Sequence, residues 1–320
     1  MTKPTPAIKN ILLLLLLALI WGPSFFFIKV ALKGFTPFTI VFCRLVLGGT
    51  IVLIWMKIQR LHVRSYLKYW KQYAIAGFFA NALPFAIITI SQKSLSSCVA
   101  AIVNSTTPLF TLIIAHFAVQ GEKLNTSKVL GVLVGMGGVV TIFIPSLFSN
   151  NLKFEYMGIV GILVASLSYG IGMVYSKNMY KKHGTQMAYG IAAGQLLFAA
   201  IMVLPFFLTY SLSSFTLDVP LSSLLSLIGL GFFGTACAFI LYHYILRTAG
   251  AGFLSYSALL FPIIGLSLGG IVLGEELTFY TMFGSILILC GLFISNFAAT
   301  IIKRYLKKPL PIAQEKKDGK

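Results

Sequence analysis

Arg44 is the residue best suited to bind a charged solute, because it is the one charged side chain deep inside an apolar segment of the sequence. It lies about six residues, or roughly 9 Å at 1.5 Å per residue, from the nearer end of that segment. No Asp or Glu lies in any apolar segment, so an anionic group of a solute is a natural partner for the guanidinium. Alternatively, Arg44 extends toward the membrane interface or binds backbone carbonyls of neighbouring helices.

Two prolines at matching places predict helix interruptions. Pro108 lies 11 residues after Ser97, and Pro262 lies 11 residues after Ala251. A proline leaves the carbonyl four residues earlier without its helical donor, so backbone acceptors are freed near the middle of both segments. Interrupted helices between two repeats are typical positions of solute sites in membrane proteins. Nearby hydroxyl groups could instead compensate the backbone, which would make both prolines structural kinks.

Aromatic and uncharged polar side chains at similar depth complete the candidate site. Trp21 and Tyr169 offer rigid surface for stacking or for contact with a cation, although helix packing would use them equally well. Amides and hydroxyls at depth could bind solute or join helices through hydrogen bonds. The predicted solute-binding residues are Trp21, Arg44, Asn81, Asn104, Pro108, Tyr169, Gln195, Thr235, Tyr256 and Pro262.

The sequence predicts no catalytic residues, no metal site and no cofactor. Its four cysteines are dispersed through apolar segments without a ligand-like spacing, and no phosphate-binding GxxxxGK[ST] motif occurs. His116 and His243 fall near the predicted cytoplasmic ends of their segments and are interpreted as interface residues. The source of energy for any solute movement is left open among facilitated diffusion, exchange and proton coupling.

The composition shows what kind of element must position these residues. Of 320 residues, 58% are hydrophobic and only 10% are charged, and the net charge is +18. A soluble enzyme could not bury so much apolar surface. The basic residues lie between apolar segments rather than on one face, so they indicate membrane orientation and not nucleic-acid binding.

The apolar segments predict an all-α membrane protein with ten transmembrane helices. Each is long enough to cross a bilayer, which takes about 20 helical residues. The predicted spans are Ile11–Leu32, Phe38–Met56, Gln72–Ser91, Ser97–Phe117, Val129–Pro145, Gly158–Ser176, Met187–Phe207, Ser223–Leu246, Ala251–Leu273 and Tyr280–Ala299.

The distribution of Lys and Arg predicts which ends of these spans are cytoplasmic. Most basic residues fall in alternate connections and in the two tails, residues 1–10 and the basic segment 300–320. Because cytoplasmic loops collect Lys and Arg, both termini are expected to be cytoplasmic. The first apolar segment is longer than a signal peptide and lacks a cleavage pattern, so it is expected to remain as the first helix.

An internal repeat divides the chain into residues 11–145 and 158–299. Gly77-Phe78-Phe79 recurs 154 residues later as Gly231-Phe232-Phe233, and Gly121-Glu122 recurs 153 residues later as Gly274-Glu275. With five spans each, the second copy must enter the membrane in the opposite direction. Such inverted-topology repeats favour a transporter with alternating access, although a channel is also compatible.

Several charged and small residues have simpler structural interpretations. Glu122 and Glu275 are expected to cap the helices that follow them, and Lys29 to interact with the carboxyl end of its own helix. Gly131, Gly135 and Gly138 would permit close approach of a neighbouring helix.

The order of these motifs resembles the drug/metabolite transporter superfamily, specifically its EamA-type proteins with ten helices and two repeats. The resemblance covers residues 11–300 and rests on Trp21-Gly22, Arg44, Pro108 before Gly121-Glu122, and Pro262 before Gly274-Glu275. It implies a bacterial inner-membrane exporter of small metabolites, often amino acids or related compounds, with a central cavity near Trp21, Arg44 and both prolines. The family pattern is not kept at Tyr169, where a tryptophan is usual, or at Ala192, the counterpart of Arg44.

The resulting hypothesis is a secondary transporter of a small amphipathic solute, surrounded by membrane lipid and with no nucleic-acid partner. A multidrug or nucleotide-sugar-like carrier of the same superfamily is an alternative, as is a lipid-modifying membrane enzyme. The glycine-rich faces leave a homodimer open.

Overall fold

The computed structural model describes residues 8–60, 68–119, 124–145, 152–183, 188–216, 218–249, 253–254, 257 and 260–295. Across these ranges the regular elements are helices and no strand is formed, which confirms the all-α prediction. Eight helical stretches are long and apolar enough to cross a membrane. The ninth and tenth predicted spans contain shorter apolar helices, Phe261–Val272 and Phe279–Phe293. Since residues 255–256 and 258–259 lie outside the described part, the count of ten spans stays a prediction.

The elements of the first repeat follow the predicted spans closely. They are α1 (Ile8–Trp21), α2 (Ser24–Ala31), α3 (Pro37–Ile58), α4 (Trp70–Gly77), η2 (Phe78–Ala82), α5 (Leu83–Ser91), α6 (Ser97–Asn104), α7 (Thr107–Ala118) and α8 (Thr126–Phe143).

The second repeat has the same succession with different interruptions. Its elements are α9 (Leu152–His183), α10 (Ala188–Tyr210), the short 3₁₀ helix η5 (Leu212–Ser214), α11 (Leu221–Gly231), η6 (Phe232–Cys237), α12 (Ala238–Thr248), α14 (Phe261–Leu266), η8 (Ser267–Val272) and α15 (Phe279–Phe293).

Polar residues before several helices define where those helices begin. Thr36, Ser96 and Thr278 each accept a hydrogen bond from a backbone amide in the first turn of α3, α6 and α15. Asn125 does the same for α8. These caps satisfy amide groups that have no helical acceptor, which matters most where the surroundings are apolar.

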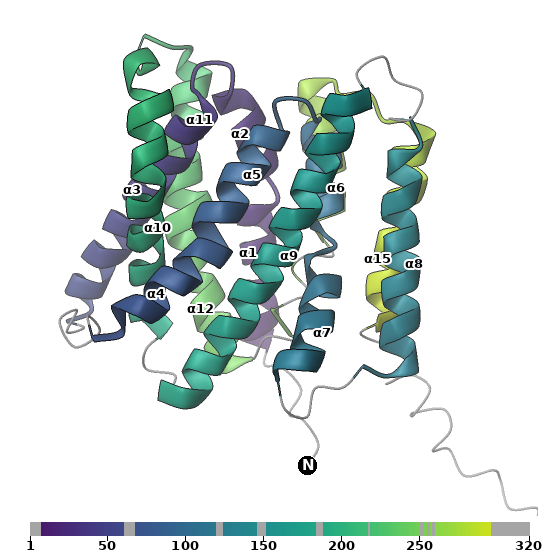
Figure 1. The fold of residues 1–320 in the computed structure, drawn as a ribbon, viewed down its shortest axis with the longest axis horizontal. Helices are drawn as coiled ribbons and strands as arrows, with labels where there is room; N and C mark the ends of the chain where they lie inside the picture. Colours follow the sequence, from purple (N-terminus) through teal and green to yellow (C-terminus); the bar gives the residue numbers. More distant parts are fainter. Residues whose placement is uncertain are drawn as a thin grey trace, which may run out of the picture.

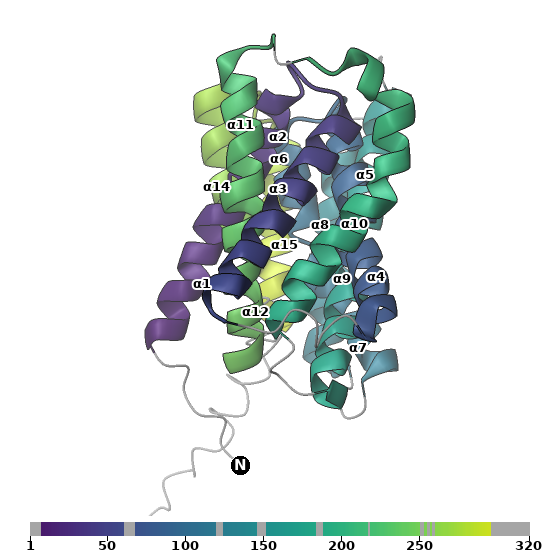
Figure 2. The same cartoon turned by 90° about the vertical axis from the view of Figure 1, so that its left-hand side faces the viewer.

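The two repeats run in opposite directions through the bundle. In Figures 1 and 2, α1 begins at the end of the molecule where the N-terminus lies, whereas α9 ends there. Elements of the two repeats are also interleaved: α3 packs on α10, and α2 packs on α11 (Figure 2). Neither repeat therefore forms a separate core.

Helices α8 and α15 form a closely packed pair at one side of the bundle (Figure 1). A Cβ placed on Gly138 would lie 2.6 Å from the carbonyl oxygen of Gly284, and one placed on Gly131 would lie 2.5 Å from that of Gly291. Glycine is thus required for the two backbones to approach this closely. This observation confirms the expected use of the small residues in the fifth predicted span.

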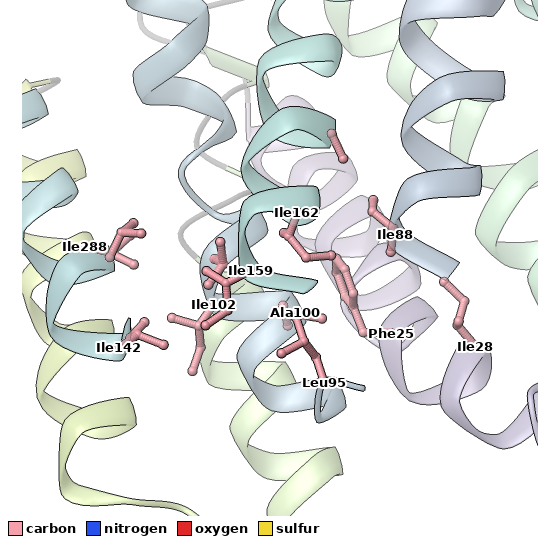
Figure 3. Close-up of a cluster of buried hydrophobic side chains, with 14 of the residues drawn as sticks. Phe25, Ile28, Ile88, Leu95, Ala100, Ile102, Ile142, Ile159, Ile162 and Ile288 are labelled. Carbon is pink, nitrogen blue, oxygen red and sulfur yellow. The ribbon is translucent and has the colours of Figure 1, made fainter. Parts of the chain in front are cut away.

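A buried hydrophobic cluster joins the two repeats (Figure 3). It brings together Phe25 and Ile28 of α2, Ile102 of α6 and Ile162 of α9, all at most 6% exposed. On the outside of the bundle, large apolar side chains such as Leu133 are exposed. Exposed apolar surface around a packed interior is what a lipid environment requires.

Candidate functional site

A cavity of about 110 Å³ lies between the repeats. It is lined by residues of α1, α2, α3, η2, α5, α6, α7, α9, α10, α12 and α14, together with residues 254 and 257. Six of the ten predicted binding residues are among them: Trp21, Arg44, Asn104, Pro108, Tyr169 and Gln195. The wall is mostly aromatic and aliphatic, and no Asp or Glu is among the described residues that line it. Such a site suits a solute with a large apolar part and few polar groups.

Arg44 supplies the cationic group of the cavity. It lies on α3 and is only 3% exposed. Its Nε donates to the hydroxyl oxygen of Thr235 at 3.2 Å, and the guanidinium carbon stands 3.8 Å from the centre of the Phe85 ring. In the described part of the chain the terminal nitrogens of Arg44 have no protein acceptor. The planar fork can therefore bind the two oxygens of a carboxylate.

Thr235 belongs to the π-helical turn η6 and links this turn to Arg44. Its hydroxyl donates to the carbonyl of Leu230 at 2.8 Å and accepts the bond from Arg44. Thr235 thus positions Arg44 rather than lining the cavity itself. A π-helical turn alters the backbone bonding and can leave carbonyls available for such contacts.

Asn81, the repeat counterpart of Thr235, lies in the equivalent turn η2. Its side chain is fully buried, and neither its amide nitrogen nor its oxygen has a hydrogen-bond partner among the described residues. Asn81 does not line the cavity, although its neighbour Ala80 does. Asn81 and Thr235 therefore occupy equivalent backbone positions but have different contacts.

Trp21 forms part of an aromatic wall. Its indole nitrogen donates to the carbonyl of Gly234 in η6 at 3.2 Å. Its ring lies against Phe239, Tyr242 and Phe261, with centroid distances of 6.0, 5.5 and 6.4 Å. Aromatic faces arranged in this way can contact an apolar side chain or a cation.

Within the described residues of the first repeat, the helices break at two turns. One is between α6 and α7, where Pro108 lies in the first turn of α7. The Asn104 carbonyl freed there accepts a bond from the Thr107 hydroxyl at 2.7 Å, and Ser166 donates to the Asn104 side chain at 3.3 Å. Hydroxyl compensation, the structural interpretation considered for this proline, therefore operates even though Asn104 and Pro108 line the cavity.

The second break of the first repeat, between α1 and α2, was not predicted. It follows Trp21 directly and is associated with Gly22 and Pro23. A Cβ on Gly22 would lie 2.6 Å from the side chain of Ile264, so this position requires glycine. The proline after Gly22 was the available signal for this break.

In the second repeat, Pro262 lies in the first turn of α14 and is buried beside the cavity residue Phe261. Tyr256 lies outside the described residues. Tyr169, on α9, lines the cavity, packs 6.4 Å from Phe85 and interacts electrostatically with Arg44. It thus stands beside the cationic group of Arg44.

The interpretation of His243 as an interface residue is wrong. His243 is fully buried on α12, where it contacts Tyr180 of α9 and Gln195 of α10. The position of His243 along its segment was misleading because α9 continues past its predicted end at Ser176 to His183, and this extension carries Tyr180 to the histidine. A histidine in an otherwise apolar segment was the available signal.

The expectation that Glu275 caps the helix that follows it, α15, is also wrong. Thr278 caps α15, whereas the Glu275 carboxylate accepts bonds from the Ser97 amide at 2.7 Å, the Cys98 amide at 2.9 Å and the Ser97 hydroxyl at 2.9 Å. Glu275 therefore caps α6 of the other repeat. The position of Glu122 lies outside the described residues.

Lys29 behaves in a similar way. It lies in the last turn of α2 as expected, but its ammonium donates to the Gln92 and Leu95 carbonyls after α5, at 2.8 and 2.7 Å. Both charged residues thus connect helices at the end of the bundle where α6 begins. Within the described residues, no group of His, Cys, Asp and Glu is arranged as a metal site.

Comparison with known proteins finds both repeats in one family. Residues 8–144 and 156–297 each match the EamA-like transporter family. The chain is 26% identical over 290 residues to an uncharacterized transporter, YoaV, of Bacillus subtilis (strain 168), covering 91% of this chain and 97% of that protein.

Two relatives come from Escherichia coli (strain K12). An uncharacterized inner membrane transporter, YedA, is 28% identical, with 82% of each chain covered. A probable amino-acid metabolite efflux pump is 26% identical, with 90% of this chain and 95% of that protein covered. A solved crystal structure superposes with a TM-score of 0.68 at 18% identity, covering 93% of this chain and 99% of the other, and so shows a shared fold.

Proposed function

The chain belongs to the EamA-like transporter family, and on this premise we propose that it exports small amphipathic metabolites, in particular amino acids with apolar side chains. The chain is accordingly a multi-pass membrane transporter and not an enzyme. We place it in the bacterial inner membrane with both termini in the cytoplasm, as the distribution of Lys and Arg favours. Transport would proceed by alternating access of the two oppositely directed repeats.

The observation that carries this proposal is the position of Arg44. No carboxylate is among the described residues that line this apolar cavity, so the buried guanidinium is costly, and a solute carboxylate would offset that cost. Arg44 is held from one side by Thr235 and Phe85, which leaves its terminal nitrogens for the solute.

The remainder of the cavity supports an amphipathic solute. Trp21, Phe239 and Phe261 supply apolar and aromatic surface for a side chain of the solute. The relative named as a probable amino-acid metabolite efflux pump is consistent with such a substrate, although its name applies to that protein alone.

The proposal is tested with purified protein and with reconstituted vesicles. Leucine, phenylalanine and methionine should raise the apparent melting temperature, because a ligand that binds the folded state stabilises it. They should also show saturable flux, whereas their methyl esters, which lack the carboxylate, should do neither. Stabilisation by nucleotide sugars or cationic drugs in place of amino acids would favour the alternative carriers. Equal binding of acid and ester would contradict the role of Arg44.

A further inference from the structure

A chain of three buried polar side chains reaches the cavity from its side. The carboxamide nitrogen of Gln195 lies 2.9 Å from Nε2 of His243, and Nδ1 of His243 is hydrogen-bonded to the hydroxyl of Tyr180. His243 is 0% exposed and Gln195 is 1% exposed. Of the three, only Gln195 lines the cavity.

The direction of each bond follows from the chemistry of the groups. A carboxamide nitrogen only donates, so Nε2 of His243 is the acceptor. The ring proton of the neutral imidazole then lies on Nδ1 and is donated to the Tyr180 oxygen. The Gln195 amide nitrogen thus sets the tautomer of His243, and Tyr180 accepts the ring proton that this tautomer carries.

The amide oxygen of Gln195 is left unsatisfied by this arrangement. It is buried and has no hydrogen-bond partner among the described residues. The hydroxyl of Ser24, another cavity residue, is also buried without a hydrogen-bond partner among the described residues. A network that served only to join α9, α10 and α12 would gain stability by satisfying both ends of the amide, because an unpaired buried acceptor is unfavourable.

We infer that His243 is a positioning residue that holds the Gln195 oxygen available as the acceptor for a hydrogen-bond donor of the solute, such as an ammonium group. The inference rests on the proposed function and adds to it a second recognition element, separate from Arg44. Arg44 would select the carboxylate of the solute, and the Tyr180, His243 and Gln195 chain would select its amine. A site with a buried acceptor discriminates strongly against analogues that lack the matching donor.

The experiment compares each amino acid with its analogue lacking the amino group. The pairs are leucine with 4-methylpentanoate, phenylalanine with 3-phenylpropanoate, and methionine with 4-(methylthio)butanoate. Apparent affinity from thermal shift and the KM and kcat of flux are measured for both members. The wild type should prefer the amino acid by about tenfold to a hundredfold.

The His243→Leu and Gln195→Leu variants should both bring this preference close to one. KM for the amino acid should rise, whereas KM for the analogue and kcat should change little. His243→Gln, which retains an acceptor for the Gln195 nitrogen, should restore the preference. His116→Leu is the matched control, because His116 lies on α7, binds the Leu124 amide and does not line the cavity.

Three outcomes would overturn the inference while leaving the proposed function intact. The first is a wild type that transports both members of each pair equally. The second is an unchanged preference in folded His243→Leu protein, and the third is a failure of His243→Gln to restore it. If His243→Leu does not fold, Tyr180→Phe is measured in its place and should reduce the preference for the amino acid several-fold. An unchanged preference in Tyr180→Phe protein would also contradict the inference. Absence of binding of every probe by the wild type would overturn the proposed substrate class and the inference with it.

Discussion

The π-helical turns Phe78–Ala82 and Phe232–Cys237 occupy equivalent places in the two repeats, yet the polar side chain of each turn is bonded differently. In the second turn, Thr235 is fully bonded, since it donates to Leu230 and accepts from Arg44. In the first turn, Asn81 is equally buried and has neither of its polar atoms bonded to the described residues.

The cause of the difference lies on the helices that face the two turns. Helix α3 packs against η6 and carries Arg44, whereas α10 packs against η2 and carries Ala192 at the counterpart position. The repeat has thus preserved the backbone of both turns but has kept a cation at only one of them. Backbone symmetry can serve the motion of a transporter, while recognition of an asymmetric solute requires different side chains in the two halves.

Replacing the cation should have the largest effect on this comparison. We expect Arg44→Gln to weaken binding of leucine by about 2–5 kcal/mol, because a desolvated charge pair is lost. The measurement is solute-dependent thermal shift together with vesicle flux. Lys33→Ala, in an exposed residue between α2 and α3, is the control and should behave as the wild type. Normal flux in folded Arg44→Gln protein would show that the two turns do not differ in function.

The next effect should come from Thr235→Val, which removes the hydroxyl at nearly constant shape. The Arg44 Nε loses its acceptor, and a hydrogen bond to a charged group contributes about 1.5–3 kcal/mol. We expect the free energy of unfolding to fall by about that amount and solute affinity to fall with it. Thermal unfolding of the purified protein measures the first quantity. An unchanged stability would mean that the contact with Arg44 contributes nothing.

A smaller effect is expected at Phe85, whose ring lies under the guanidinium. Phe85→Leu keeps an apolar side chain but removes a cation–π contact of about 0.5–2 kcal/mol. Its repeat counterpart Phe239 contacts Trp21 instead, so Phe239→Leu is the natural comparison. Only Phe85→Leu should weaken the preference for leucine over leucine methyl ester. The same change in both variants would indicate a packing effect.

The smallest change, with the opposite sign, is predicted at Asn81. Asn81→Leu removes two buried polar atoms that have no partner, so stability should be unchanged or should rise by about 1–2 kcal/mol. Thermal unfolding of the Asn81→Leu and Thr235→Val proteins, measured together, tests whether substitutions at the two equivalent positions change the stability in opposite directions. A strong loss of stability or of flux in Asn81→Leu would indicate that the amide has a partner during transport.

Much of the fold could be predicted from sequence because hydrophobic length and repetition are local properties. The register from Gly77 to Gly231 located both π-helical turns as equivalent places, although not their geometry. The position of a charged residue, Arg44, deep within an apolar segment likewise predicted that it lines the cavity. These signals depend on neighbours along the chain and on the cost of burying polar groups.

What could not be predicted depends on distant parts of the chain. Lys29 and Glu275 both lie near helix ends, as expected for charges that interact with helix termini, but each binds a helix other than its own. The burial of His243 results from α9 and α10 packing over it. Hydropathy measures how apolar a segment is, and it contains no information on which helix will cover which residue.

The cap on α6 has a consequence for how the protein is made. Ser96 satisfies one amide of that helix locally, but the Ser97 and Cys98 amides depend on a carboxylate at position 275. Ribosomes extend a chain from its amino end, so all of the first repeat is synthesised before Glu275 exists. Until Glu275 has been synthesised, the Ser97 and Cys98 amides of α6 therefore lack the carboxylate that they bind in the folded protein. Maturation of the first half is completed by nearly the last residues to be inserted.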